Sequence, residues 1–467
     1  MSKDKIVYPY VPNSVPEIKA AMLKEVGAKD IMDLYEEIPE NLKFKGKMNL
    51  PEPILDEYSI RRHVEGLLNK NKHCSDHLNF LGAGCAQHFI PAVCDEINGR
   101  GEFLTAYAMD TYADHGKWQA LFEYCSLMAE LLDMDVLGTP QHDGMSAAST
   151  SLRMSARLTG RKEFLLPATL NPDVLLVMKD YMRGLTEPQY PIQLVDFDPK
   201  TGLMDLADLA SKISSKTAAV LIENPSYLGF IETQAAEIGK IVQGSGAQFV
   251  VSTDPISLGV LAPPVQYGAN LTCGDFHSLG VHMQAGGGQG GFIAAPDDMR
   301  YISEFKDLMF GLTETVKEGE YGFGEVLFDR TSYGSREEGK EFTGTTAALW
   351  AITAAVYLTL MGPQGMAEVG QTITQMAQYA AKQISGIKNV ELVFATPFFK
   401  EFVVNFDKTK KSVAQINKAL LARKIFGGKD ISAEFPALGQ SALYCVTEIK
   451  TDEDIDKLVS ALTEATS

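Results

Sequence analysis

Between about residue 75 and residue 300, short apolar runs alternate with longer stretches of helical character, and this alternation constrains the fold more than any other feature of the sequence. It favours βαβ units around a mostly parallel sheet. The short connections suit a doubly wound sheet, in which binding sites lie at the carboxyl ends of the strands. The chain is therefore predicted to be an α/β protein. The predicted strands are Glu163–Leu166, Ile192–Asp196, Ala218–Glu223, Gln248–Thr253, Asn270–Gly274 and Gly291–Ala295.

The segments on either side of this region have a different character. The N-terminal part is rich in charge and proline, with two short amphipathic stretches, Pro16–Glu25 and Ile60–Asn69. Residues 301–343 are charged and dotted with glycine, and they are predicted to be an irregular linking segment. Two helices should follow, separated at Gly362-Pro363 because proline cannot continue a helix. The predicted division is an N-terminal helical arm (1–74), a large α/β domain (75–343), and a helical linker with a small C-terminal α+β domain (344–467).

The charge balance is acidic, with 42 Lys and Arg against 60 Asp and Glu and a formal net charge of −18. A nucleic-acid binder needs a basic face to neutralise phosphates, so this class is excluded. The chain has no run of ~18 uncharged apolar residues, and its N-terminus lacks the apolar stretch of a signal peptide. We therefore expect a cytoplasmic protein with no membrane partner. The six cysteines include no CxxC pair and are predicted to be reduced.

The most informative site candidate is Asp254, which directly follows a predicted strand. In pyridoxal-phosphate enzymes of the aminotransferase type, an acidic residue ending a strand pairs with the pyridine nitrogen, and a lysine roughly twenty residues later forms the Schiff base. Here no lysine occurs between residues 241 and 305, and His277 stands about where it would be expected. An imidazole cannot condense with an aldehyde, so the chain is predicted not to hold pyridoxal phosphate covalently.

Two glycine-containing segments could contact phosphate. Asp143, Gly144 and Ser146 open a predicted helix at the place where such folds bind phosphate, although a plain capped helix explains the same residues equally well. Residues 286–291 contain the pattern GxGxxG, but this pattern precedes a strand instead of leading from a strand into a helix. A dinucleotide site is therefore disfavoured relative to a loop that lets backbone approach closely.

Other side chains have the chemistry of metal ligands or nucleophiles. The candidate metal ligands are His73-Cys74-Ser75-Asp76-His77 and the trio Cys273, His277 and His282. Neither group has the paired spacing of a structural zinc site, so no metal site is predicted. Cys85 with His88 could form a thiolate pair, but a buried cysteine beside a packed histidine is the favoured interpretation.

Several short motifs occur in the order in which one known family has them, from residue 10 to beyond residue 360. They are Tyr10-Val11-Pro12-Asn13, Phe80-Leu81-Gly82-Ala83-Gly84 with His88 and Ile90-Pro91, Phe103-Leu104-Thr105-Ala106-Tyr107, Gln119-Ala120-Leu121-Phe122-Glu123-Tyr124, Met134-Asp135-Val136, Asp143-Gly144, Asp254-Pro255-Ile256-Ser257-Leu258, Ser278-Leu279-Gly280, Arg336-Glu337 and Leu360-Met361-Gly362-Pro363-Gln364-Gly365. With these motifs the sequence resembles subunit 1 of the two-subunit glycine dehydrogenase (decarboxylating), the P-protein of the glycine cleavage system. The resemblance covers essentially the whole chain.

The resemblance implies a pyridoxal-phosphate-dependent transferase fold of type I. It also implies a homologous subunit 2 that carries the pyridoxal phosphate, in an α2β2 hetero-oligomer that decarboxylates glycine and passes the aminomethyl group to the lipoyl arm of an H-protein. This subunit would support the partner's pocket and the channel for the lipoyl arm. The groups expected near that pocket are Thr105, Tyr107, His142 and His277, and those expected at a vestigial or partner-completing cofactor site are Asp143, Gly144, Ser146 and Asp254.

Departures from the family pattern fall inside the matching motifs. Asp110, Asp114 and His115 replace apolar and amide groups after Tyr107, and His142 stands where the family usually has tyrosine. These changes would alter the charge of whatever the loops face, and they indicate a divergent paralogue. The main hypothesis is an enzyme half acting on glycine or a related small amino acid. The alternatives are a non-catalytic scaffold or regulatory pseudoenzyme, and a self-sufficient enzyme that uses the new His and Asp side chains, with or without a metal.

Overall fold

The structure is a computed structural model that describes residues 7, 8, 10–104, 117–183, 190–283, 290–327, 329, 331–341 and 345–467. The chain divides into two compact units, residues 1–71 and 72–467. The described part of the first unit contains helices α1 and α2 and the short 3₁₀ turns η2 and η3, and none of its side chains is buried. Both predicted amphipathic stretches coincide with its helices. The bounds are η2 (Pro12–Ser14), α1 (Pro16–Glu25), η3 (Ile31–Tyr35) and α2 (Glu57–Leu68).

The second unit is built on a seven-stranded sheet with the strand order β2-β8-β7-β6-β5-β3-β4. Strands β4, β3, β5, β6 and β7 run parallel to one another. Strand β8 is antiparallel to β7, and β2 is antiparallel to β8. The prediction of an α/β fold with a mostly parallel sheet is confirmed. The bounds are β2 (Val136–Leu137), β3 (Glu163–Pro167), β4 (Ile192–Val195), β5 (Thr217–Glu223), β6 (Gln248–Ser252), β7 (Leu271–Asp275) and β8 (Gly291–Ala295).

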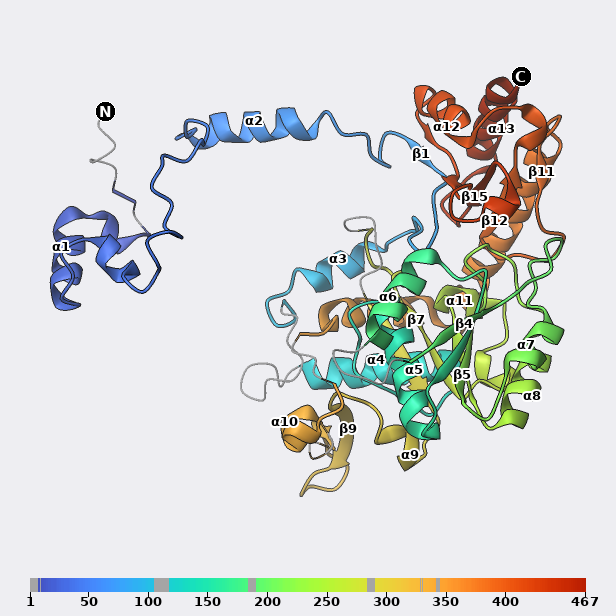
Figure 1. Cartoon of the computed structure of the whole chain (residues 1–467), viewed down its shortest axis with the longest axis horizontal. Helices are drawn as coiled ribbons and strands as arrows, with labels where there is room; N and C mark the ends of the chain where they lie inside the picture. Colours follow the sequence, from blue (N-terminus) through green and yellow to red (C-terminus); the bar gives the residue numbers. More distant parts are fainter. Residues whose placement is uncertain are drawn as a thin grey trace. The chain divides into compact units, whose positions relative to one another are not determined.

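The central strands are apolar at nearly every position because helices cover both faces of the sheet (Figure 1). Val220, Ile222 and Phe249 pack with α7 and α8, whereas Leu221 and Val250 pack with α5 and α6. Successive strand side chains point to opposite faces, so a strand buried on both sides reads as a continuous apolar run. The bounds are α5 (Gly144–Thr159), α6 (Pro172–Arg183), α7 (Leu206–Lys212) and α8 (Ala235–Ser245).

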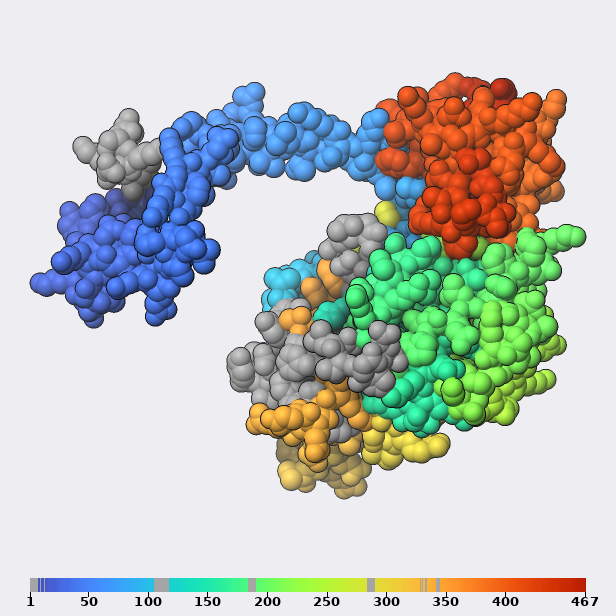
Figure 2. Space-filling model, viewed as in Figure 1, coloured from blue at the N-terminus to red at the C-terminus, as the bar shows by residue number. Residues whose placement is uncertain are grey.

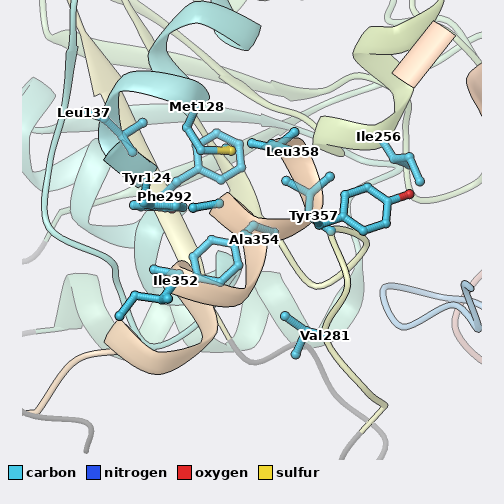
Figure 3. Packing of buried hydrophobic residues seen from close by; sticks show 14 of the residues in the cluster. Tyr124, Met128, Leu137, Ile256, Val281, Phe292, Ile352, Ala354, Tyr357 and Leu358 are labelled. Atoms are coloured by element: carbon cyan, nitrogen blue, oxygen red, sulfur yellow. The ribbon is translucent and has the colours of Figure 1, made fainter. Parts of the chain in front are cut away.

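A further apolar cluster lies where α4 and the first half of α11 pack against the sheet (Figure 3). Tyr124 and Phe292 are fully buried in it, and Tyr357 is nearly so. The ring of Tyr124 meets that of Phe276 edge-on, with the centroids 5.4 Å apart. This cluster fixes the end of β7, which carries part of the candidate site. The bounds of the helices on this side are α3 (Ala92–Asn98), α4 (Lys117–Leu132) and α11 (Ala348–Ser385).

Helix α11 leads from the sheet to the C-terminal part and bends at Gly362, where φ is 59° and ψ is −177°. Glycine tolerates a positive φ, and the following Pro363 has no N–H to continue the helical ladder. The predicted break between two helices is therefore confirmed. No helix in the described ranges is both long enough and apolar enough to cross a membrane.

The residues after α11, numbers 386–467, form what we call the C-terminal lobe, coloured orange to red in Figure 2. Its four-stranded antiparallel sheet has the order β11-β12-β15-β14. The apolar residues of α12, α13 and the second half of α11 pack with this sheet. Strand β13 pairs separately with β1 (Leu78–Asn79). The bounds are β11 (Glu391–Leu392), β12 (Glu401–Asn405), α12 (Val413–Ala422), β13 (Ile425–Phe426), β14 (Lys429–Asp430), β15 (Ser441–Cys445) and α13 (Asp452–Thr466).

The prediction of an irregular segment at residues 301–343 was wrong. Strands β9 (Met309–Glu314) and β10 (Tyr321–Val326) form a regular antiparallel hairpin there, between the short helices α9 (Met299–Ile302) and α10 (Ser332–Ser335). Met309 is its only buried strand residue, the others are half-buried or exposed, and glycines stand at positions 311, 322 and 324. A hairpin that buries little has no alternating apolar pattern, so the period-two signal on which strand prediction depends is missing.

Candidate functional site

A cavity of ≈ 280 Å³ lies at the carboxyl ends of the parallel strands, between the start of α5 and the start of β12. Three neighbouring strands each bring a carboxyl group to its wall. Glu223 ends β5, Asp254 follows β6 by two residues, and Asp275 ends β7. The carboxyl ends of parallel strands meet at one edge of a sheet, and this edge is where ligands bind in open α/β folds. The cavity is therefore the candidate functional site.

Asp254 is held by partners on both of its carboxylate oxygens. Ser278 Oγ donates to Oδ1 at 2.7 Å, and the backbone N–H of Ile256 donates to the same oxygen at 3.3 Å. Lys400 Nζ forms an ion pair with Oδ2 at 2.5 Å. Burial acts to raise the pKa of Asp254, but the charges of Lys400 and His88 and the hydrogen bonds from Lys400 and Ser278 together outweigh it and hold this pKa below its usual value.

The ion pair continues into a buried chain of polar groups. Lys400 Nζ lies 3.3 Å from His88 Nε2, and His88 Nδ1 lies 2.9 Å from Glu448 Oε2. Glu448 also accepts a hydrogen bond from the backbone N–H of Phe89 at 2.6 Å. The side chains of His88 and Glu448 are only 2% and 11% exposed. Lys400 and Glu448 belong to the C-terminal lobe, so this series of polar contacts links that lobe to Asp254 beside the sheet.

At the other side of the cavity, the start of α5 rests on the end of β7. Asp275 Oδ2 accepts from the backbone N–H of Gly144 at 2.9 Å, and Oδ1 accepts from the N–H of His277 at 2.8 Å. A side chain at Gly144 would bring its Cβ to 2.9 Å from the Cβ of Asp275, so this position is tightly packed. Asp143 caps the helix, because its Oδ1 accepts from the N–H of Ser146 at 2.7 Å.

Burial dominates the electrostatics of the remaining cavity groups. It raises the pKa of Glu223 to about 7 and that of Asp275 to about 7. It lowers the pKa of His277 to about 4, so the imidazole is neutral near pH 7. Burial also raises the pKa of Cys85 to about 11, and this cysteine is therefore a thiol and not a thiolate.

The structure brings some of the predicted site residues together. Asp143, Gly144, Asp254 and His277 all line the cavity. Ser146 lies in the first turn of α5 with its side chain in the capping box, and His142 is exposed just before that helix. Thr105, Tyr107, Asp110, Asp114 and His115 lie outside the described residues, as do residues 286–289 of the glycine-rich segment.

The candidate thiolate pair and metal groups can also be placed. Cys85 Sγ lies 3.7 Å from His277 Nε2, whereas His88 is engaged with Glu448 and Lys400. Cys85 and His88 therefore have separate partners. Within the described ranges, no three His, Cys, Asp or Glu side chains are arranged to hold a metal ion.

Among the cavity-lining residues that sequence reasoning missed are four with ionisable side chains: Glu223, Asp275, Lys400 and Glu401. Glu223 and Asp275 end predicted strands in the same way as Asp254, so comparing the ends of neighbouring strands would have found them. Lys400 and Glu401 come from the C-terminal lobe, more than 120 residues later in the chain. No local pattern marks these two residues, because only the packing of the two parts brings them to the site.

The site does not fit pyridoxal phosphate. A Schiff base needs a neutral amine, and the only lysine among the described lining residues is Lys400. Burial acts to lower the pKa of this lysine, but Asp254, with smaller contributions from Cys445 and Glu401, raises it above its usual value, so the amine stays protonated. Asp254 already has a cationic partner, and the N–H groups of Gly144 and Ser146 already bind carboxylates. The groups that would bind the pyridine nitrogen and the phosphate in this fold are therefore already engaged within the chain, and no described lining residue can form a Schiff base with the aldehyde.

A mixed sheet with its site at the strand ends, followed by a small C-terminal lobe, defines the type I fold of pyridoxal-phosphate enzymes. A sphingosine-1-phosphate lyase of Burkholderia pseudomallei shares this fold, with a TM-score of 0.64 at 15% identity over 92% of this chain and 94% of that one. The chain itself belongs to the glycine cleavage system P-protein family, whose family model matches residues 9–462. The resemblance found in the sequence is thus confirmed.

Individual relatives match over nearly the full length. The chain is 38% identical to the "Probable glycine dehydrogenase (decarboxylating) subunit 1" of Staphylothermus marinus over 98% of both proteins. It is 36% identical to the protein of the same name from Carboxydothermus hydrogenoformans, over 97% of this chain and 99% of that one. A crystal structure of inhibitor-bound glycine decarboxylase (P-protein) of the glycine cleavage system has a TM-score of 0.85 at 30% identity and covers 98% of this chain and 100% of that one.

The raised pKa values predict that the folded chain loses stability as the pH rises from about 4 to about 7. Asp275 and Glu223 bind protons more tightly in the folded state than in the unfolded state, where a carboxyl group has a pKa of ~4. The free energy of unfolding should therefore fall with rising pH, by on the order of 3 kcal/mol for each group. Urea unfolding between pH 5 and pH 8 measures this slope, and Asp275→Asn and Glu223→Gln should each flatten it.

Asp298→Asn is the matched control for this pH dependence. Asp298 is an exposed helix cap whose pKa is lowered, chiefly by its hydrogen bond with Arg300, so it titrates below the window. The substitution should leave the slope between pH 5 and pH 8 unchanged. An equal slope in the wild type, Asp275→Asn and Glu223→Gln would show that neither carboxyl group is protonated in the folded chain at pH 5.

Proposed function

We propose that this chain is subunit 1 of a two-subunit glycine dehydrogenase (decarboxylating) and the subunit that does not carry pyridoxal phosphate. Its full-length relatives bear the name subunit 1. The observation that carries the proposal is the set of side chains in the cavity at the strand ends, which does not fit the cofactor. Among the described residues that line the site, no lysine is free to form a Schiff base, and Asp254 is paired with Lys400. A chain of this family that cannot hold the cofactor needs a homologous subunit that does.

The first unit supplies a surface for that partner. Most of the exposed large apolar side chains of the described residues lie between Val7 and Leu68. None of the described side chains in this unit is buried, so the unit has no core of its own. Apolar surface on this scale marks an interaction site. We assign residues 1–74 as an arm that binds the partner, residues 75–343 as the large domain, and residues 344–467 as the linker and small domain.

The apolar side of α2 indicates how the arm would bind the partner. Ile60, Val64, Leu67 and Leu68 recur at helical spacing, and each is 40–57% exposed. Residues at such spacing share one side of a helix. An amphipathic helix of this kind binds by laying its apolar side into a groove of a partner protein. The partner we propose is the homologous subunit 2, in an α2β2 assembly.

The site residues take supporting roles in this proposal. His277 is neutral near pH 7, and its Nε2–H donates to the carbonyl oxygen of Ala86 at 3.0 Å, so we assign it a structural hydrogen bond and no role as a general acid. Asp143, Gly144, Ser146 and Asp254 form the vestigial cofactor site. Thr105, Tyr107 and His142 border the partner's pocket and the channel for the lipoyl arm of the H-protein. Pyridoxal phosphate on subunit 2 supplies the electron sink for decarboxylation of glycine.

Reconstitution of the activity tests this function. The purified chain is mixed with its homologous subunit 2 and a lipoyl H-protein, and release of labelled carbon dioxide from glycine is followed. We expect turnover with both subunits and only background with either subunit alone, because the cofactor and its supporting surface lie on different chains. Full turnover by subunit 2 without this chain would overturn the proposal and favour the regulatory role. So would a mixture inactive on glycine and on other small amino acids, which would favour a non-catalytic scaffold.

A further inference from the structure

Two positions that bind charged groups of pyridoxal phosphate in the type I fold are occupied in this chain by its own side chains. Asp254, the counterpart of the acid that pairs with the pyridine nitrogen, pairs with Lys400 at 2.5 Å. The start of α5, where such folds bind phosphate, donates the N–H of Gly144 to Asp275 and the N–H of Ser146 to Asp143. A lysine ammonium and two carboxyl groups thus stand at these two positions of the site.

Lys400 reaches Asp254 from a different part of the molecule. It immediately precedes β12 of the C-terminal lobe, while Asp254 follows β6 of the large sheet. Its side chain is 14% exposed and that of Asp254 is 22% exposed, so the pair is largely shielded from water. A buried ion pair whose members belong to two packed parts holds those parts in one arrangement, and loss of one member leaves an unpaired buried charge.

The rest of the lining disfavours a phosphorylated ligand. Glu223, Asp143 and Glu401 line the cavity together with Asp275, and the only lysine among the described lining residues is already neutralised by Asp254. Glu401 Oε1 accepts from the backbone N–H of Ala83 at 2.6 Å, which fixes the loop before α3 over the cavity. A phosphate dianion entering here would meet carboxyl groups and no free positive charge.

We propose that the cofactor site of this chain is filled by its own side chains. Lys400 pairs with Asp254 in the place of a pyridinium, and Asp275 binds the start of α5 in the place of a phosphate. The site therefore binds no pyridoxal phosphate, either covalently or non-covalently. The Lys400–Asp254 pair instead fixes the C-terminal lobe on the large sheet. This inference rests on the proposed function, because it explains how subunit 1 keeps its shape with no cofactor of its own.

The first test is a calorimetric titration of the full-length chain with pyridoxal phosphate, and with pyridoxamine phosphate, which has no aldehyde and cannot form a Schiff base. We expect no saturable binding up to millimolar ligand, and the cofactor-bearing subunit 2 serves as the positive control. Saturable binding that Asp254→Asn abolishes would overturn the proposal. Absence of binding, or binding that Asp254→Asn leaves unchanged and that therefore lies elsewhere, supports it.

The second test is a double-mutant cycle on the pair, read as the midpoint temperature of unfolding. Lys400→Met and Asp254→Asn should each lower this temperature by roughly 4 °C, because each leaves a lone buried charge. The double variant should lose clearly less than the sum of the two, since it buries no unpaired charge. Lys400→Arg, which keeps the positive charge, should restore most of the loss. If the single variants do not fold, recovery of a folded double variant supports the same conclusion.

The exposed ion pair between Lys408 and Glu391, in the same lobe, is the matched control. Their side chains are 60% and 54% exposed, so Lys408→Met and Glu391→Gln should have small, additive effects. Additive losses at Lys400 and Asp254 would overturn the proposed role of the pair. These single-chain measurements are independent of the reconstitution with glycine, so failure of that assay alone would refute the proposed function and not this inference.

Discussion

Replacing Val64 and Leu68 together with glutamate is expected to abolish assembly of this chain with subunit 2 and, with it, decarboxylation of glycine. The two side chains lie on the apolar side of α2 and are 43% and 57% exposed. Burying such a side chain stabilises an interface by roughly 1.5–3 kcal/mol, so losing two corresponds to at least a hundredfold rise in the dissociation constant. Analytical ultracentrifugation of the mixed subunits measures assembly, and labelled glycine measures turnover.

Ser59→Glu combined with Arg62→Gln is the control for charge. Helical spacing places these residues on the side of α2 away from Val64, and the pair changes the net charge by the same −2. We expect assembly and turnover close to those of the wild type. The isolated variant with glutamates should unfold at the wild-type temperature, because neither side chain is buried. Normal assembly of that variant would contradict the proposed arm.

Much of the fold could be predicted because its strands are buried on both faces. Every predicted strand of the large sheet appears within a few residues of its expected bounds, since a helix-covered strand such as Thr217–Glu223 is apolar along nearly its whole length. The break at Gly362-Pro363 was equally predictable, because it follows from backbone chemistry at two residues. The exposed hairpin of β9 and β10 was missed because it has no apolar pattern to detect.

The site was only half predictable. The sequence shows that no lysine follows Asp254 at the expected distance. The position of Asp254 after a strand identifies this residue as the counterpart of a cofactor-binding acid. What balances that acid is not visible, because Lys400 lies in another part of the chain and nothing around it differs from an ordinary turn before a strand. A counter-ion supplied by tertiary packing carries no local signal, so the structure was needed to find it.

The end of β7 is the second position where a small change should have a large effect. Gly274→Ala is expected to lower the free energy of unfolding by roughly 3 kcal/mol, because the added Cβ would lie 2.1 Å from the carbonyl oxygen of Thr253 and 2.8 Å from the ring of Phe292. The first atom is backbone directly after the neighbouring strand β6 and cannot rotate away. The strand end must shift, which pulls Asp275 from the N–H groups of Gly144 and His277. Urea unfolding measures the loss.

Gly324→Ala separates this steric effect from the general cost of placing alanine in a strand. Gly324 lies in β10, and a Cβ there meets no atom within 4 Å. Its free energy of unfolding should stay within about 0.5 kcal/mol of the wild type. Equal stability of the two variants would mean that β7 and β6 are not packed as closely as the structure has them. A loss confined to Gly274→Ala ties the stability of the chain to the same strand end that positions Asp275 at the start of α5.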